Sequence, residues 1–207
     1  MISAKEMKEL EHWATQQGIS IEELMENAGK AVFETVREKY DLVGKQIVVF
    51  CGQGNNGGDG FVAARYFGKE ARTLVLFFGD KDKLSEEAEL NYNKIRLALP
   101  VIKIGSKEDL IKFKFQKGID YILIDAILGM GIKGKAREPF SSGIDLFNFI
   151  PGIKVAVDLP SGLDPDTGEA EDKCCQADLI VCFHELKKGL EKFKDRIVVV
   201  DIGIPKN

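Results

Sequence analysis

Residues 52–60, Gly-Gln-Gly-Asn-Asn-Gly-Gly-Asp-Gly, combine glycines with small polar side chains in a way that suits ligand binding. They follow the apolar run 47–51, and an apolar β-branched run broken by glycine predicts a buried strand that ends in a loop. We expect a helix over 59–66 to follow. The backbone N–H groups of such a loop and the N-terminus of such a helix can together bind an anion such as a phosphate. An ordinary surface turn is the alternative, but it needs only about two to four special residues.

Two acidic residues lie at the ends of other predicted strands. Asp125 opens the glycine-spaced segment 125–135, and Asp158 opens the segment 158–162, Asp-Leu-Pro-Ser-Gly. Either acid alone could do no more than fix a turn. Two carboxylates at the ligand-binding edge of a sheet are costly, however, unless they bind a cation, a hydrogen-bond donor or a proton in transit. We therefore expect the three segments to form one polar cluster.

Oxygen-bearing side chains in this cluster could also hold a hard cation. Asn56, Asp125 and Ser161 offer amide, carboxylate and hydroxyl oxygens, which suit such an ion better than a soft metal. Because the set has only one carboxylate, it favours a monovalent ion over Ca²⁺. The only histidines are His12 and His184, so a histidine-based metal centre or a Ser-His-Asp mechanism is hard to build. We expect carboxylates to carry any acid–base chemistry.

The glycine spacing by itself does not identify the ligand. Gly52, Gly54 and Gly57 fit the dinucleotide pattern G-x-G-x-x-G, which is weak evidence on its own. A Walker A loop is excluded because no Gly-Lys-Ser/Thr sequence follows.

Strand and helix patterns alternate around these segments. Capping-box sequences beginning at Ser3 and Ser20 predict two N-terminal helices, the second ending near Tyr40. Apolar strands separated by helices predict an α/β fold, a Rossmann-like three-layer αβα sandwich with a mainly parallel sheet and two N-terminal helices. In that architecture ligands bind beyond the carboxyl ends of the strands, at a switch point. The other strands are expected at 72–78, 101–104, 121–124, 154–157, 177–182 and 196–200, and the other helices at 85–99, from 106 onward, and at 141–149.

Length and composition bound the class of protein. We expect residues 1–207 to form one domain whose helical N-terminal extension, 1–40, packs on the sheet; the same extension could serve a second subunit. The chain has 33 acidic against 29 basic side chains and no long Lys/Arg block, so nucleic-acid binding is not expected. No apolar stretch approaches the roughly 18 residues needed to cross a bilayer, and residues 1–18 do not resemble a signal peptide. We expect a cytoplasmic protein with reduced thiols at Cys51, Cys174, Cys175 and Cys182.

Three longer motifs resemble the NAD(P)HX epimerase family, also called the YjeF N-terminal domain. They are Leu-Met-Glu-Asn-Ala-Gly at 24–29, Gly-Asn-Asn-Gly-Gly-Asp-Gly at 54–60 and Asp-Leu-Pro-Ser-Gly-Leu-Asp at 158–164, and the resemblance spans nearly the whole chain. It implies an isomerase that interconverts the R and S epimers of hydrated NADH or NADPH, called NADHX and NADPHX, so that a stereospecific dehydratase can restore the cofactor. Because the chain ends at Asn207, we expect a stand-alone form that works with a separate ADP- or ATP-dependent dehydratase. We also expect a homodimer.

The resemblance also implies roles for individual residues. Asp158 would contact the substrate and act as the acid–base group, either by assisting loss of the hydroxyl group or by ring opening and reclosure. Asn56, Asp125 and Ser161 would bind one potassium ion per subunit. The implied substrate-binding residues are Asn55, Asn56, Gly57, Gly58, Asp59, Gly129, Met130, Gly131, Ile132, Lys133, Gly134, Lys135 and Asp158.

One segment departs from the family pattern. The family often has a threonine followed by a Pro-Lys pair and a glycine, whereas residues 182–189 read Cys-Phe-His-Glu-Leu-Lys-Lys-Gly. Lys188 and Gly189 are retained without the proline, so the family pattern does not define the contour of this side of the pocket. We interpret His184 as a surface or rim residue, because a lone histidine without an orienting partner is rarely functional.

Two other functions fit parts of the pattern. A non-catalytic nucleotide-binding, RNA-binding or dimerisation module of the same fold could dispense with the acids or with the loop asparagines, and all of these are present here. An ordinary NAD-dependent dehydrogenase would need a substrate domain, for which 207 residues leave little room.

Overall fold

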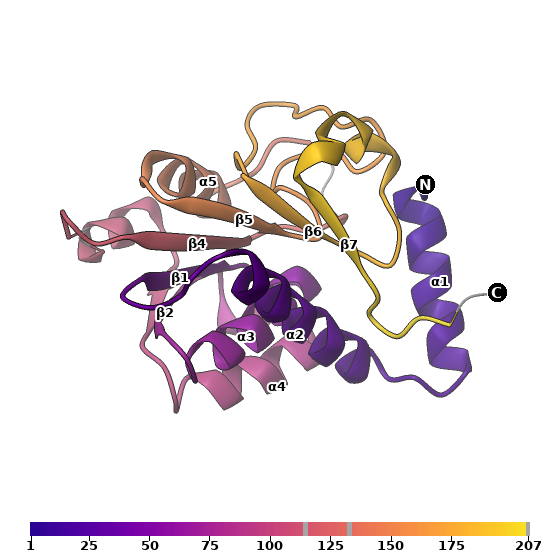
Figure 1. Ribbon diagram of the computed structural model, residues 1–207, viewed down its shortest axis with the longest axis horizontal. Coiled ribbons are helices and arrows are strands. Elements are labelled where there is room, and N and C mark those ends of the chain that lie inside the picture. Colours follow the sequence, from indigo (N-terminus) through magenta and orange to yellow (C-terminus); the bar gives the residue numbers. More distant parts are fainter. Residues whose placement is uncertain (114–115, 132–133, 206–207) are drawn as a thin grey trace.

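A computed structural model describes residues 1–113, 116–131 and 134–205. Within them lies one sheet of seven parallel strands in the order β3-β2-β1-β4-β5-β6-β7 (Figure 1). The order reverses direction between β1 and β4, as in doubly wound sheets that bind ligands at this point. The strands are β1 (Gln46–Cys51), β2 (Arg72–Phe78), β3 (Val101–Ile104), β4 (Tyr121–Ala126), β5 (Ile153–Val157), β6 (Leu179–Phe183) and β7 (Ile197–Val200).

Helices cover both faces of the sheet, which confirms the predicted αβα sandwich. Three helices, α2 (Ile21–Lys39), α3 (Asn55–Phe67) and α4 (Glu86–Ile95), lie on one face, and α5 (Phe140–Phe149) lies on the other (Figure 1). Alternate residues of β1 enter the two cores: Ile47 and Val49 pack with α2 and α3, and Val48 and Phe50 pack with α5. Strands buried on both faces explain the continuous apolar runs in the sequence. Three 3₁₀ helices complete the described elements, at Lys81–Lys83, Lys107–Lys112 and Lys188–Arg196.

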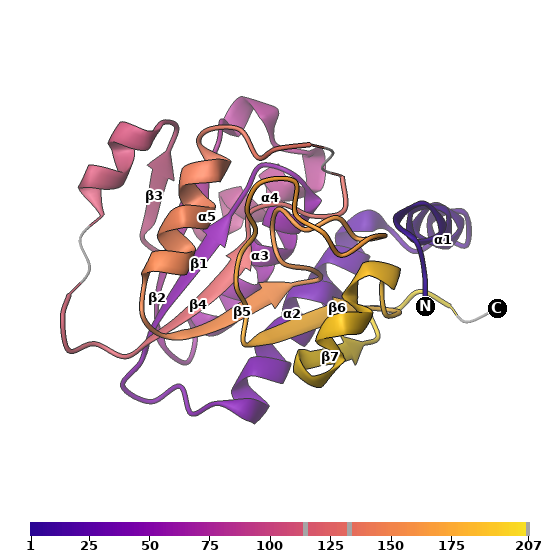
Figure 2. The ribbon, with the colours of Figure 1, turned by 90° about the horizontal axis from the view of Figure 1, so that it is seen from above.

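Helix α1 (Ala4–Gln16) stands apart from both helical layers, beyond the carboxyl ends of the strands and near the C-terminal segment (Figures 1 and 2). Its N-terminus has the predicted capping box: Ser3 Oγ accepts from Glu6 N at 3.2 Å, and Glu6 Oε2 accepts from Ser3 N at 2.7 Å. At the start of α2, Ser20 Oγ accepts from Glu23 N at 3.1 Å. Among the described residues, no helix is both long and apolar enough to span a bilayer.

The largest difference from the sequence prediction concerns the glycine-rich stretch. We predicted a loop followed by a helix from residue 59, but α3 begins at Asn55, so only residues 52–54 connect β1 to it. The helical glycines serve close packing: a Cβ at Gly58 would lie 2.5 Å from the Met25 side chain, and one at Gly60 would lie 2.6 Å from Ala126 Cβ. Tertiary packing therefore overrides the low helix propensity of glycine here.

Other boundaries shift by a few residues. Helix α4 ends at Ile95 instead of 99, and a turn leads to Pro100. Strand β4 continues to Ala126, which places Asp125 inside the strand and not after it. Strand β6 runs over Leu179–Phe183, where we predicted 177–182. All four cysteines are free thiols.

Candidate active site at the switch point of the sheet

A cavity of about 820 Å³ opens at the switch point between β1 and β4. This volume is within the range of small-molecule sites, roughly 300–1,000 Å³. Segments that follow β1, β4 and β5 form one part of its lining, and helices α1 and α2 form another. Helix α1 contributes Lys8, Glu11, His12 and Thr15.

The structure brings most of the predicted substrate-binding residues to this cavity. Its lining includes Asn55, Asn56, Asp59, Gly129, Met130, Gly131, Lys135 and Asp158. Gly57 and Gly58 are buried in the packing of α3 beside it, and Gly134 lies outside the lining. Ile132 and Lys133 lie outside the described residues.

Backbone-to-backbone contacts hold the segments after β1 and β4 together. A Cβ at Gly52 would lie 1.8 Å from the Ile127 carbonyl oxygen, and a Cβ at Gly57 would lie 2.0 Å from the Gly52 carbonyl oxygen. Neither position has room for a side chain. The glycines thus set the distance between two walls of the cavity.

Substituting Gly57 with alanine is expected to destabilise the fold by about 1–3 kcal/mol, the usual cost of overpacking, because the clash is with backbone that cannot rotate away. Gly105→Ala is the matched control, since the nearest atom to its Cβ, Asp109 Oδ2, is 3.6 Å away. Urea unfolding of the two variants checks the prediction. Equal midpoints would show that the loop relaxes to accept a methyl group.

A buried polar network lies beneath the cavity. Asp125 and Ser161 are both fully buried. Asp125 accepts from Ser161 Oγ at 2.5 Å, from Ser161 N at 2.8 Å and from Ile127 N at 3.2 Å. Asn56 Nδ2 donates to the Leu128 carbonyl oxygen at 3.1 Å, and Leu128 N donates to Ser161 Oγ at 2.8 Å. The three residues predicted to bind a cation are therefore connected through the backbone of Leu128.

The donor atoms of this network fit a hard monovalent cation. Ser161 Oγ lies 2.5 Å from Asp125 Oδ1 and 3.1 Å from the Leu128 carbonyl oxygen, and its single hydroxyl proton can serve only one of these two contacts, so one pair of oxygens is left with lone pairs facing each other. Burial raises the pKa of Asp125, and the hydrogen bonds from Ser161 and Ile127 oppose the rise. No ion pair to Asp125 occurs in the described ranges, so a cation would balance its charge. The described residues contain no cluster of three His, Cys, Asp or Glu side chains that could hold a metal ion.

Asp158 forms a buried ion pair with Lys187. Asp158 is 6% exposed and Lys187 is 0% exposed. Lys187 Nζ bonds to Asp158 Oδ1 and to the Phe183 carbonyl oxygen at 2.8 Å, and Phe183 N donates to the same Asp158 oxygen at 3.0 Å. Burial is the largest single effect and would lower the pKa of Lys187, but the charge and hydrogen bond of Asp158, together with the charges of Cys182 and Glu11, raise that pKa above its ordinary value. Asp158 has a positive φ of 63°, a conformation that aspartate and asparagine tolerate better than most residues.

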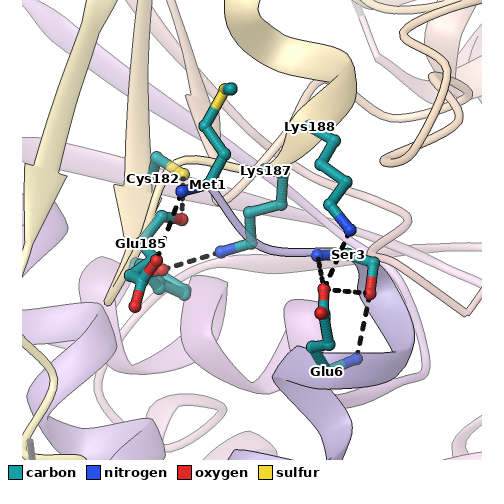
Figure 3. A network of polar contacts seen from close by, with 8 residues as sticks. Met1, Ser3, Glu6, Cys182, Glu185, Lys187 and Lys188 are labelled. Atoms are coloured by element: carbon teal, nitrogen blue, oxygen red, sulfur yellow. Dashed lines mark hydrogen bonds and ion pairs between the residues drawn. The ribbon is translucent and has the colours of Figure 1, made fainter.

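Lys187 is the main functional candidate that the sequence did not indicate. The N-terminal segment pairs with the backbone on either side of it: Ile2 N donates to the Leu186 carbonyl oxygen at 2.9 Å, and Lys188 N donates to the Ile2 carbonyl oxygen at 3.0 Å. The neighbouring Lys188 reaches in another direction, to Glu6 at the start of α1 (Figure 3). No local sequence pattern marks Lys187 as different from its neighbours. Its backbone pairing with the distant N-terminus is what distinguishes it. His184 is half-buried and does not line the cavity.

Known proteins share both the sequence and the fold. A family model described as "YjeF-related protein N-terminus" matches residues 21–189. An NAD(P)H-hydrate epimerase of Cenarchaeum symbiosum is 41% identical over 209 residues, which cover 99% of this chain and 95% of that protein. A bifunctional NAD(P)H-hydrate repair enzyme Nnr of Pyrobaculum aerophilum is 43% identical over 190 residues, which cover 88% of this chain and 37% of that protein.

A crystal structure of a yeast protein has the same fold. It superposes with a TM-score of 0.84 at 23% identity and covers 97% of this chain and 87% of that chain. The fold comparison and the sequence matches agree with the resemblance carried by the three motifs. This chain therefore belongs to the YjeF N-terminal family.

Proposed function

We propose that this protein is an NAD(P)H-hydrate epimerase, an isomerase that interconverts the R and S epimers of NADHX or NADPHX. The Cenarchaeum relative with this name covers nearly the whole chain, whereas the chain spans only 37% of the bifunctional Pyrobaculum relative. The observation that carries the proposal is the carboxylate of Asp158. It is held by Lys187 and lines a cavity at the switch point that also contains Asn55, Asn56 and Asp59.

The chemistry of the substrate requires such a group. The carbon that is inverted bears a hydroxyl group and is bonded to the ring nitrogen. The nitrogen lone pair can expel the hydroxyl when an acid assists, and water that returns to the other face gives the opposite epimer. A positioned general acid or base contributes about 10² to 10⁴ in rate. Asp158 is the proposed acid–base residue, and the predicted residues in the cavity lining are the proposed contacts to the dinucleotide.

We assign the oxygen network beneath the cavity to one potassium ion per subunit. Asn56, Asp125 and Ser161 would hold it, and the Leu128 carbonyl oxygen would be a fourth donor. Two facing oxygens and a buried carboxylate that has no cationic partner among the described residues support this assignment. A bound cation would supply a fixed positive charge that orders the segments after β1 and β4. The homodimer, the single-domain arrangement and the coupling to a separate dehydratase remain predictions.

Potassium is expected to stabilise the folded protein. A ligand that binds only the native state adds about 2.7 kcal/mol at roughly 100 times its dissociation constant. Melting temperatures in potassium chloride and in tetramethylammonium chloride of equal ionic strength measure this gain. Asn56→Ala should reduce the gain, whereas Asn93→Ala, which removes an exposed hydrogen bond to Arg96 at the end of α4, should retain it. Equal melting temperatures in the two salts would refute the potassium assignment.

A mixture of the two NADHX epimers tests the proposed function directly. With a dehydratase specific for the S epimer alone, about half of the mixture should remain; with this protein added, both epimers should be consumed. The epimerase function is excluded if the R epimers of both NADHX and NADPHX persist at high protein concentration.

A further inference from the structure

Asp59 is a second carboxylic acid in the cavity, and its surroundings differ from those of Asp158. It lies in α3, is half-buried, and lines the cavity. Its side chain has no hydrogen bond or ion pair to any residue within the described part of the chain, whereas Asp158 has both a lysine partner and a backbone donor. An acid without a partner that faces a ligand cavity is available to a substrate.

The charges around Asp59 favour its protonated form. Burial raises the pKa of Asp59 well above its usual range, and the negative charges of Asp158 and of Glu11 on α1 add to the rise, while Lys187 opposes it. Glu11 is also half-buried in the lining, and burial and Asp158 raise its pKa against the opposing charges of Lys187 and Lys8. Asp59 and Asp158 thus line one cavity but have unlike environments, an arrangement that lets one enzyme hold both an acid and a base.

Building on the epimerase function proposed above, we propose that Asp59 donates the proton to the departing hydroxyl group, and that the Asp158 carboxylate, held by Lys187, accepts the proton of the entering water. Asp59 thereby becomes a catalytic residue with a role of its own. Lys187 becomes a positioning residue that acts through Asp158.

The proton and electron balance closes with these two groups. The Asp59 proton moves to the hydroxyl oxygen, the carbon–oxygen bond breaks with its electron pair on the leaving water, and the nitrogen lone pair forms a carbon–nitrogen double bond. A water lone pair then attacks the carbon on the other face, the double-bond pair returns to nitrogen, and the excess proton of that water moves to Asp158. One proton has passed from Asp59 to Asp158, and the reverse epimerisation returns it. Exchange with water in the cavity resets the pair between turnovers.

Asp59→Asn is the critical variant, because asparagine keeps the size of the side chain and cannot act as an acid. We expect kcat to fall about 10²-fold with little change in KM, the loss typical of a general acid. The wild-type rate should fall as the pH rises through the pKa of Asp59, and this alkaline limb should be absent in the variant. Asp145→Asn, at an exposed ion pair with Lys173 outside the cavity, should keep the wild-type profile. Glu11→Gln should lose much less rate than Asp59→Asn.

Stability provides an independent readout of the same group. A carboxyl whose pKa is raised on folding contributes stability that is fully present below its unfolded pKa and is lost as the pH rises through its folded pKa. The melting temperature of Asp59→Asn should therefore equal or exceed that of the wild type, with a difference that grows as the pH rises. A structural role would give the opposite sign. If Asp59→Asn does not fold, the pH dependence of the wild-type rate is the test. A wild-type rate that does not fall at high pH overturns the proposal.

The possible failures are distinguishable. If the wild type does not epimerise either substrate, the proposed function fails. If the wild type is active and Asp59→Asn keeps kcat within threefold, raises only KM, or keeps the alkaline limb, then the acid role of Asp59 fails while the epimerase function stands. A larger loss for Glu11→Gln than for Asp59→Asn would also overturn the assignment.

Discussion

Replacing Asp158 with asparagine is expected to lower the rate of epimerisation by about 10² to 10⁴, the contribution of a positioned acid–base group. Asparagine fits the space and tolerates the positive φ of 63° at this position, so the backbone should not be strained. Binding of the dinucleotide should remain largely intact, because the other lining residues are unchanged. The measurement is the rate of R-epimer consumption in a coupled dehydratase assay, together with the dissociation constant for NADHX.

The same variant should also lose stability, which must be separated from the loss of rate. Asparagine leaves the Lys187 ammonium buried without a carboxylate, and breaking a buried pair in this way costs about 3–5 kcal/mol. Rates should therefore be measured at a temperature where the circular dichroism of the variant shows full folding. Asp145→Asn controls for removal of an exposed acid. Equal turnover of both epimers by folded Asp158→Asn would show that Asp158 is not the acid–base group.

The parts of the site that could be predicted from the sequence are those that depend on local pattern. A continuous apolar run predicts a strand buried on both faces, and the residues at its carboxyl end must then lie at the ligand edge. This logic places Asp125, Asp158 and the segment after β1 together, and the structure brings all three to the switch point. The seven strands were predicted for the same reason, within a few residues at each end.

The parts that could not be predicted depend on contacts between distant segments. Gly57 looks like a loop residue in the sequence, yet it lies in α3, where the Gly52 carbonyl oxygen occupies the space that a side chain would need. Glu11 belongs to an amphipathic helix, where a polar residue normally faces solvent, and the position of α1 beyond the sheet turns it toward the cavity. Position 187 is separated by 185 residues from Ile2, with which it forms a β-bridge. No local pattern reports that pairing.

Replacing Lys187 with methionine is expected to destabilise the fold by about 3–5 kcal/mol, because methionine fills the apolar path of the side chain but leaves the buried Asp158 carboxylate without its cation. The neighbouring variant Lys188→Met is the matched control. It removes an exposed pair with Glu6, and surface ion pairs of this kind contribute little to stability. The measurement is the free energy of unfolding in urea for each variant.

The pH dependence of the stability lost in Lys187→Met tests whether the ion pair between Lys187 and Asp158 causes that loss. The pKa of Lys187 is raised on folding above the ordinary value of 10.5, so the stability it contributes is fully present below that value and is lost only as the pH rises through the folded pKa. The deficit of Lys187→Met should therefore persist through neutral pH and shrink above pH 10.5. The double variant Asp158→Asn, Lys187→Met should recover part of the stability, because no buried charge is left unpaired, but it should recover none of the activity. A deficit no larger than that of Lys188→Met, or activity restored in the double variant, would contradict the role of Lys187 as the buried ion-pair partner of Asp158.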